Sequence, residues 1–266
     1  MFVELHQVTS ALYLAAGLVA GVGLELPAPR LVRVGVALLA LGALVHGLAF
    51  LALHAAAQPP PLTDLPAAVS LAAWIAVVFF LTFLRRARLA GLVVVLGPVA
   101  FVGAFYAALR LPHSERAPFV GSASWPHAHV LLGSAGLALF GLAGLAGLFF
   151  LVVNRSLKRK RPGGASRALP LPSLEALDRV NAVAFAAGFP LLTLGLVTGF
   201  IWMQHESGRL WTGTAHETWT AVAWSIYAAL AALRFVRHER GREAALASLA
   251  GFAFLLFAVV GVGLLS

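Results

Sequence analysis

The chain has 266 residues, of which 61% are hydrophobic and 11% are charged, and its formal net charge is +9. A mean hydropathy of +0.91 and this low charge content exclude an ordinary soluble domain, in which about a quarter of the residues are charged. The absence of cysteine excludes disulfides, thiolate metal sites and thioether attachment of a prosthetic group to this chain.

Continuously apolar runs recur along the chain, each of roughly 20 residues, which is enough to cross the hydrocarbon core of a bilayer as a helix. Strands of a membrane barrel would instead alternate apolar and polar residues. We therefore predict an all-α, polytopic transmembrane bundle that forms one integral membrane domain over residues 1–266. Its eight spans are expected at about 8–26, 31–54, 65–84, 89–109, 126–153, 182–203, 214–235 and 244–265.

Local signals refine these spans in chain order. The first run is preceded by Glu4 and His6 rather than by a positively charged leader, so a retained helix is expected. Asp64 is a candidate N-cap for the third helix. Residues 173–181 have apolar positions at helical spacing and are a candidate interfacial segment before the sixth helix. Pro190 is expected to kink that helix.

The basic residues predict how the spans are oriented. Sixteen of the nineteen Lys and Arg residues fall in the first, third, fifth and seventh connections, and seven of these lie in the basic loop 154–179. The positive-inside rule places these connections in the cytoplasm and accounts for the net charge without nucleic acid. With an even number of spans, both termini then lie on the outer side. Seven of the nine histidines fall at or near that outer face: His6, His54, His113, His127, His129, His205 and His216.

His46 lies inside the otherwise apolar second helix. An ionisable side chain at that depth is costly, so it must face the bundle interior or a partner. Two interpretations remain open. The ring is either a neutral imidazole hydrogen-bonded to a Ser or Thr of a neighbouring helix, or it is an axial metal ligand or proton-handling group.

His127 and His129 mark the start of the fifth helix, next to Pro126, a residue that suits a first helical turn. Residues two apart point to different faces of a helix, so these two do not ligate one ion together. His129 is the deeper of the two and is either a ligand or an interfacial anchor. The same helix carries glycines that indicate close helix packing: Gly133, Gly136, Gly141, Gly144 and Gly147.

The segment from Trp211 to Trp224, WTGTAHETWTAVAW, which we call the tryptophan stretch, concentrates aromatic and ionisable residues. Thr214-x-x-Glu217 matches a capping box and predicts that the seventh helix starts at Thr214. Tryptophans are expected in an interfacial belt. Aromatic walls and imidazoles also suit a flat, iron-containing ligand. The candidates to line such a recess are Trp202, His205, Glu206, Trp211, His216 and Trp219.

Four stretches resemble the cytochrome c assembly family of membrane proteins, the CcsA- and HemX-like group that includes the YpjD-like proteins. In the family's order they are LVHGLAF around His46, PHAHVLLGSAGLALFGLAGL around His129, GFPLLTLGLVTGFIW at residues 188–202, and WTGTAHETWTAVAWSIYAALAALRF at residues 211–235. The similarity extends over most of the chain from the second predicted helix onward.

The resemblance implies that haem is held at the outer face by a tryptophan-rich loop with flanking histidines as axial ligands. Trp211, Glu217, Thr218 and Trp219 match the core of that loop, whereas residues 213–216 differ from its Trp-Asp-Pro-Lys part. This difference argues against lyase activity and favours the HemX- or YpjD-like branch.

The resemblance also assigns individual histidines. His129 matches the family's outer histidine before the loop, and His46 matches a histidine in the second helix of the YpjD-like branch. The outer histidine expected after the loop has no counterpart in the last predicted helix, which ends GVGLLS. His205 or His216 is the candidate replacement.

We therefore predict a multi-pass protein of the bacterial cytoplasmic (inner) membrane that binds haem non-covalently and acts in cytochrome c-type biogenesis or assembly. Coordination and presentation need no reaction by this chain, and covalent attachment would occur on a partner's thiols. Expected partners are the lipid bilayer, haem and other membrane proteins of cytochrome assembly or respiration. The predicted iron ligands are His129 and His46, and the other predicted haem-binding residues are His205, His216, Trp211 and Trp219.

Two alternatives remain open. In the first, the chain is a non-catalytic scaffold or regulatory subunit of the same family that has lost haem binding. In the second, it is a proton or solute transporter that uses His46.

Overall fold

The computed structural model describes residues 1–56, 61–84, 89–111, 124–158 and 172–258. This part of the chain is all-helical, as predicted. The elements are α1 (Phe2–Glu25), α2 (Pro29–His54), α3 (Leu65–Leu84), the short 3-10 helix η1 (Ala90–Leu92), α4 (Val93–Arg110), α5 (Ser124–Lys158), α6 (Leu174–Ser207), α7 (Ala215–Phe235) and α8 (Arg242–Leu256).

Six helical segments within these ranges are long and apolar enough to cross a membrane, namely α1, α2, α3, η1 with α4, α5 and α6. The helix α7 and the described part of α8 are not among the six. The prediction of eight spans therefore stays a prediction. The predicted end of the last span, residues 259–265, lies outside the described residues, as do His113 and the middle of the basic loop.

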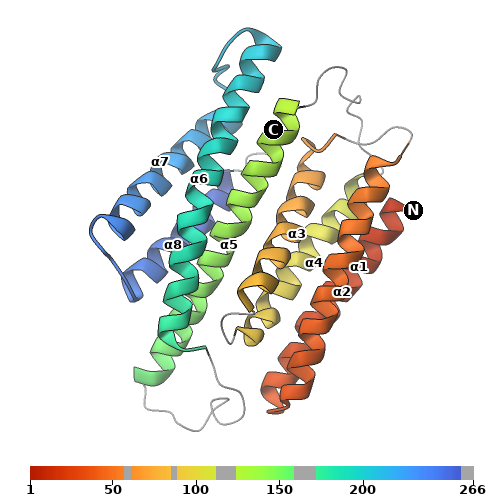
Figure 1. Ribbon diagram of the computed structural model, residues 1–266, viewed down its shortest axis with the longest axis vertical. Helices are drawn as coiled ribbons and strands as arrows, with labels where there is room; N and C mark the ends of the chain where they lie inside the picture. Colours follow the sequence, from red (N-terminus) through yellow and green to blue (C-terminus); the bar gives the residue numbers. More distant parts are fainter. Residues whose placement is uncertain (57–60, 85–88, 112–123, 159–171, 259–266) are drawn as a thin grey trace.

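The helices form two groups, α1–α4 and α5–α8, which meet where α3 packs against α5 (Figure 1). Consecutive helices run in opposite directions, so their ends gather at two ends of the bundle. We call one the histidine end, where α2, α4 and α6 finish and α3, α5 and α7 begin. At the other, which we call the basic end, α5 and α7 finish and α2, α6 and α8 begin.

The distribution of charge fits these two ends. Among the described Lys and Arg residues, only Arg110 and Arg209 lie at the histidine end. The others are at or near the basic end: Arg30, Arg33, Arg155, Lys158, Arg179, Arg234, Arg237, Arg240 and Arg242.

Several helices extend beyond the apolar runs that predicted them. The helix α1 begins at Phe2, α5 runs from Ser124 to Lys158, and the segment 173–181 is the start of α6 rather than a separate interfacial element. Ser173 caps α6 by accepting a hydrogen bond from the Ala176 N–H at 3.1 Å. Capping satisfies an N–H group that the helix itself leaves unpaired. The polar turns after Ser173 are therefore helical and continue directly into the apolar part of α6.

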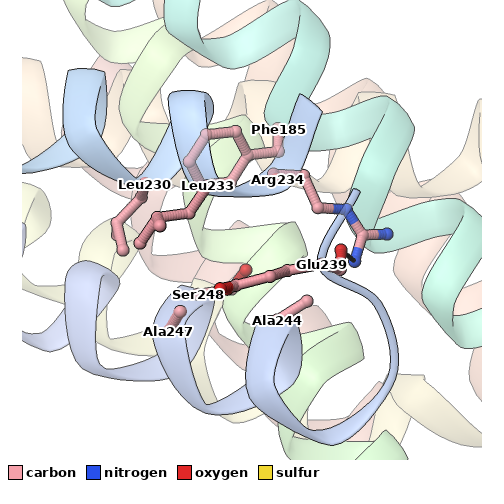
Figure 2. Close-up of a pocket in the computed structure, with 8 residues that line it drawn as sticks. All are labelled: Phe185, Leu230, Leu233, Arg234, Glu239, Ala244, Ala247 and Ser248. Carbon is pink, nitrogen blue, oxygen red and sulfur yellow. Dashed lines mark hydrogen bonds between the residues drawn. The ribbon is translucent and has the colours of Figure 1, made fainter. Parts of the chain in front are cut away.

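A buried guanidinium ties the helices together at the basic end. Arg234 of α7 forms an ion pair with Asp178 of α6 at 3.0 Å and donates to the Glu239 carbonyl at 3.0 Å. The Asp178 carboxylate also accepts from the Gly241 N–H at 3.1 Å. A small pocket lies beside Arg234, between α6, α7 and α8 (Figure 2). It lies at the opposite end of the bundle from His129, so it belongs to a different part of the protein from the predicted haem site.

The helices α5 and α6 approach closely through glycine. A Cβ atom on Gly136 of α5 would lie 2.8 Å from the backbone nitrogen of Leu192, and one on Gly195 of α6 would lie 2.8 Å from the backbone nitrogen of Gly133. Backbone atoms cannot move aside as a flexible side chain can. The pair therefore keeps its spacing only with glycine at Gly136 and Gly195, as membrane helix interfaces often require.

We expect Gly136→Ala to lower the free energy of unfolding by about 1–3 kcal/mol, because the new methyl group overpacks the α5–α6 contact. The matched control is Gly133→Ala on the same helix, where an added Cβ meets no atom within 4 Å. That variant should be neutral or stabilised by up to about 1 kcal/mol through helix propensity. Thermal unfolding of both variants in the same detergent is the measurement, and equal losses would contradict this account of the interface.

Candidate functional site

His129 is held in one orientation by α6. Its Nδ1 atom lies 2.7 Å from the Gly195 carbonyl oxygen. Because a carbonyl only accepts hydrogen bonds, Nδ1 must carry the proton, which leaves the lone pair of the neutral ring on Nε2. The ring sits over Gly199, and the Trp202 ring lies 6.0 Å away between centroids. A metal-binding histidine needs such a fixed orientation, although a backbone-carbonyl bond also occurs at His6 and His54.

His216, in the first turn of α7, lies near enough to His129 for the two rings to interact electrostatically. The His216 side chain is exposed to solvent and adjoins Glu217 in the sequence. The structure thus brings two of the predicted ligands, His129 and His216, into one neighbourhood.

The other histidines at this end have different neighbours. His205 of α6 stacks on Trp125 at 6.4 Å between centroids, and His127 faces His54 of α2 at 6.3 Å. His127 and His129 are therefore turned toward different helices, in line with their spacing of two. Within the described chain no group of three or more His, Asp or Glu side chains is placed to hold a metal ion.

The predicted aromatic walls contact different helices. Trp211 lies against Phe200 of α6 with ring centroids 6.1 Å apart. Trp219 lies against Phe254 and Phe257 at 6.1 and 5.4 Å. Both tryptophans keep about two fifths of their surface exposed, 43% for Trp211 and 38% for Trp219. Each therefore keeps aromatic surface that the described chain does not cover.

Glu217 fastens the loop before α7. Thr214 is the N-cap, as predicted, and its hydroxyl oxygen accepts from the Glu217 N–H at 3.3 Å. The carboxylate does not return to Thr214 N–H as in a capping box. It accepts instead from the N–H groups of Thr212 at 2.8 Å and Gly213 at 2.9 Å, and from the Thr212 hydroxyl. Partial burial raises the pKa of this carboxyl, but these hydrogen bonds outweigh it and hold the pKa below its usual value.

His46 is fully buried between α1, α2 and α3. Its Nδ1 lies 3.2 Å from the Tyr13 hydroxyl and its Nε2 lies 2.8 Å from the Ser70 hydroxyl. Phe50 stacks on its face at 5.2 Å and the ring of His6 meets it edge-on at 5.3 Å. Both ring nitrogens are thus engaged by hydroxyl groups, and the structure groups His46 with His6 rather than with His129.

Several residues around His129 and around His46 were not predicted from the sequence. Gly195, Thr198 and Gly199 lie in the stretch 188–202, whose glycine spacing signals close packing but not a histidine partner. Tyr13 and Ser70 carry no sequence signal that links them to His46. Their roles depend on contacts between helices that are distant in the sequence.

Comparison with known proteins identifies the family. The family described as "Cytochrome C assembly protein" matches residues 35–266. The chain belongs to this family. The match begins within α2 and includes α5, which carries His129, and α6, which holds its ring.

Three proteins that share one name are similar to this chain over much of their length. The "Cytochrome c biogenesis protein CcsA" of Microcystis aeruginosa is 28% identical over 253 residues, which covers 77% of this chain and 76% of that protein. The protein of the same name from Thermosynechococcus vestitus is 29% identical over 209 residues, 65% of this chain and 66% of that protein. The one from Porphyra purpurea is 27% identical over 244 residues, 77% of this chain and 76% of that protein.

We expect His46→Leu to destabilise the protein by about 2–4 kcal/mol, because the Tyr13 and Ser70 hydroxyls would stay buried without their partner. The measurement is thermal unfolding in detergent. The matched control is His54→Leu near the end of the same helix, where the histidine bonds the Phe50 carbonyl of its own helix rather than hydroxyl groups of neighbouring helices. An unchanged unfolding midpoint in His46→Leu would contradict a structural role for this ring.

A second variant tests the loop. Glu217→Ala should free the turn before α7, because the amides of Thr212 and Gly213 lose their acceptor. Limited trypsin digestion in detergent should then cleave after Arg209 several-fold faster than in the wild-type protein. Glu206→Ala removes an exposed acid nearby and should leave the rate unchanged. Equal rates in all three proteins would show that Glu217 does not hold the loop.

Proposed function

We propose that this protein acts in cytochrome c biogenesis by holding haem non-covalently at the histidine end of the bundle. His129 would bind the haem iron together with His216, with His205 as the alternative to His216. The exposed rings of Trp211 and Trp219 would provide aromatic surface for the haem. Membership of the cytochrome c assembly family supports the process, and the geometry around His129 supports the ligand.

The hydrogen bond from His129 to Gly195 is the observation that carries this proposal. It fixes the neutral tautomer with the proton on Nδ1, so that the Nε2 lone pair is available to iron. A site with two imidazoles suits haem better than a bare ion, because within the described chain no third His, Asp or Glu side chain is placed to complete a metal site. Haem would contribute the iron chemistry, while this chain binds the group, sets its orientation and keeps a hydrophobic surface beside it.

We further propose that the protein is a multi-pass component of the bacterial inner membrane, with the histidine end on the outer side. The concentration of arginine at the basic end supports this orientation through the positive-inside rule. It places the proposed haem site on the side of the membrane where a partner would present its thiols. The tryptophan stretch lacks the Trp-Asp-Pro-Lys part of the family's loop, which supports coordination and presentation rather than lyase activity and fits the YpjD-like branch.

The role predicted for His46 has less support. As an iron ligand His46 would have to give up a hydrogen bond to Tyr13 or to Ser70, and Phe50 already covers its face. A proton path through His46 would run along the same two hydrogen bonds, so the transporter alternative is decided by the flux measurement below. If the protein is instead a scaffold that has lost haem binding, the purified protein should stay colourless when hemin is supplied.

The test is the visible spectrum of the full chain, purified in detergent with hemin supplied. The wild-type protein should show a Soret band, and His129→Ala should reduce it to background because an axial ligand is lost. His127→Ala, two residues away and facing His54, should retain the band. Comparison of His216→Ala with His205→Ala identifies the second ligand.

The outcomes separate the proposals. A wild-type protein that stays colourless with hemin would reject haem binding and leave the scaffold alternative. A Soret band that survives His129→Ala would reject His129 as the ligand. For the transporter alternative, flux in proteoliposomes should depend on His46, and unchanged flux in His46→Ala would reject it.

A further inference from the structure

One face of α6 holds three residues that act on the ring of His129. Gly195, Thr198 and Gly199 are spaced three and four apart, so they lie together on a helix surface. The carbonyl oxygen of Gly195 accepts the Nδ1–H of His129 at 2.7 Å. It also accepts from the Thr198 hydroxyl at 2.9 Å. The same face thus provides the acceptor for His129 and a second donor to that acceptor.

Gly199 provides the space in which the ring lies. A Cβ atom at this position would be 2.8 Å from Nδ1 of His129 and 3.0 Å from its Cε1. The ring cannot move away while it keeps its bond to Gly195, because the contact and the bond involve the same nitrogen. Any side chain at position 199 therefore forces His129 to rotate and to give up the Gly195 carbonyl.

Thr198 limits how strongly that carbonyl can accept from His129. Its single hydroxyl hydrogen is shared between the carbonyls of Leu194 at 2.8 Å and Gly195 at 2.9 Å, which is a three-centre bond. Because the Gly195 carbonyl also accepts the helical N–H of Gly199, each additional donor on it weakens the others. A weaker bond at Nδ1 leaves less electron density on Nε2 for a metal, since the partner of the second nitrogen sets the strength of a histidine ligand.

We propose that Gly199 and Thr198 are positioning residues for His129, a proposal that rests on the proposed haem site. Gly199 fixes the orientation in which Nε2 is presented, and Thr198 moderates the strength of the iron bond. The combination holds haem in one geometry but reversibly, as a protein that passes haem to a partner requires.

The first test needs no haem. Histidine is labelled with 15N, and the His129 signals are assigned by their loss in His129→Gln. The wild-type ring should show its proton on Nδ1. In Gly199→Ala that proton should move to Nε2 in a large part of the population, because the bond to Gly195 is broken. Gly133→Ala, which adds the same methyl group to open space on α5, should keep the wild-type tautomer.

The second test uses Thr198. In Thr198→Val the Nδ1 proton should shift downfield because the His129 bond to Gly195 strengthens, and Thr198→Ser should restore the wild-type position. With hemin bound, transfer of ferric haem to apomyoglobin should be several-fold slower in Thr198→Val and normal in Thr198→Ser. Gly199→Ala should weaken haem binding by about 10- to 100-fold, the usual effect of disturbing a ligand's hydrogen-bond partner.

The outcomes distinguish this proposal from the proposed function. A wild-type protein that binds no hemin rejects the haem site, yet the 15N spectra still decide whether Gly199 and Thr198 control the ring. An unchanged tautomer in Gly199→Ala overturns the role of Gly199. An unchanged proton shift in Thr198→Val, or faster haem transfer from it, overturns the role of Thr198.

Discussion

Two long antiparallel helices, α5 and α6, lie so close that a methyl group at Gly136 or Gly195 would collide with the backbone of the other helix. In a membrane the hydrophobic effect does not drive helices together, so close packing and hydrogen bonds between helices must do so. The bond from His129 to the Gly195 carbonyl is one result of this spacing. If the helices moved apart by the width of a methyl group, the bond would be lost and the ring would be free to rotate. The candidate site therefore depends on the glycines that set the distance between α5 and α6.

The sequence predicted the helices far better than their contacts. Apolar runs predicted where the helices lie, and the Thr214 cap predicted where α7 begins, because both signals are local. The polar first turns of α6 were predicted to be a separate interfacial segment. Hydropathy alone does not show that a capped helix continues beyond its apolar run. For His46 the sequence predicted a hydroxyl partner on a neighbouring helix as one of two interpretations, and Ser70 is such a residue. The partner of His129 is 66 residues away in the sequence, and no single-chain pattern indicates that pairing.

Glu217 shows how a residue of a divergent motif keeps a physical role. Its carboxylate binds the backbone N–H groups of Thr212 and Gly213. Every residue except proline offers such a group, so this contact does not depend on the side chains that follow at positions 214–216. The acidic residue also lies in the first turn of α7, where the helix dipole favours a negative charge. The loop can therefore hold its shape, and present Trp211, although it departs from the family's tryptophan-rich core.

The number of ring nitrogens that the protein uses separates the two histidines that the sequence singled out. His46 engages both, with Tyr13 and Ser70, so the ring closes a contact among three helices and has no lone pair to offer. His129 engages one through Gly195, which sets the tautomer and leaves Nε2 for a ligand. The sequence singled out His46 because it lies inside an apolar helix, where an ionisable residue is costly. Cost alone does not separate a structural role from a functional one. The hydroxyl partners of His46 tie its ring to the contact of α1, α2 and α3, whereas His129 commits one nitrogen to Gly195, an arrangement that the proposed haem site requires.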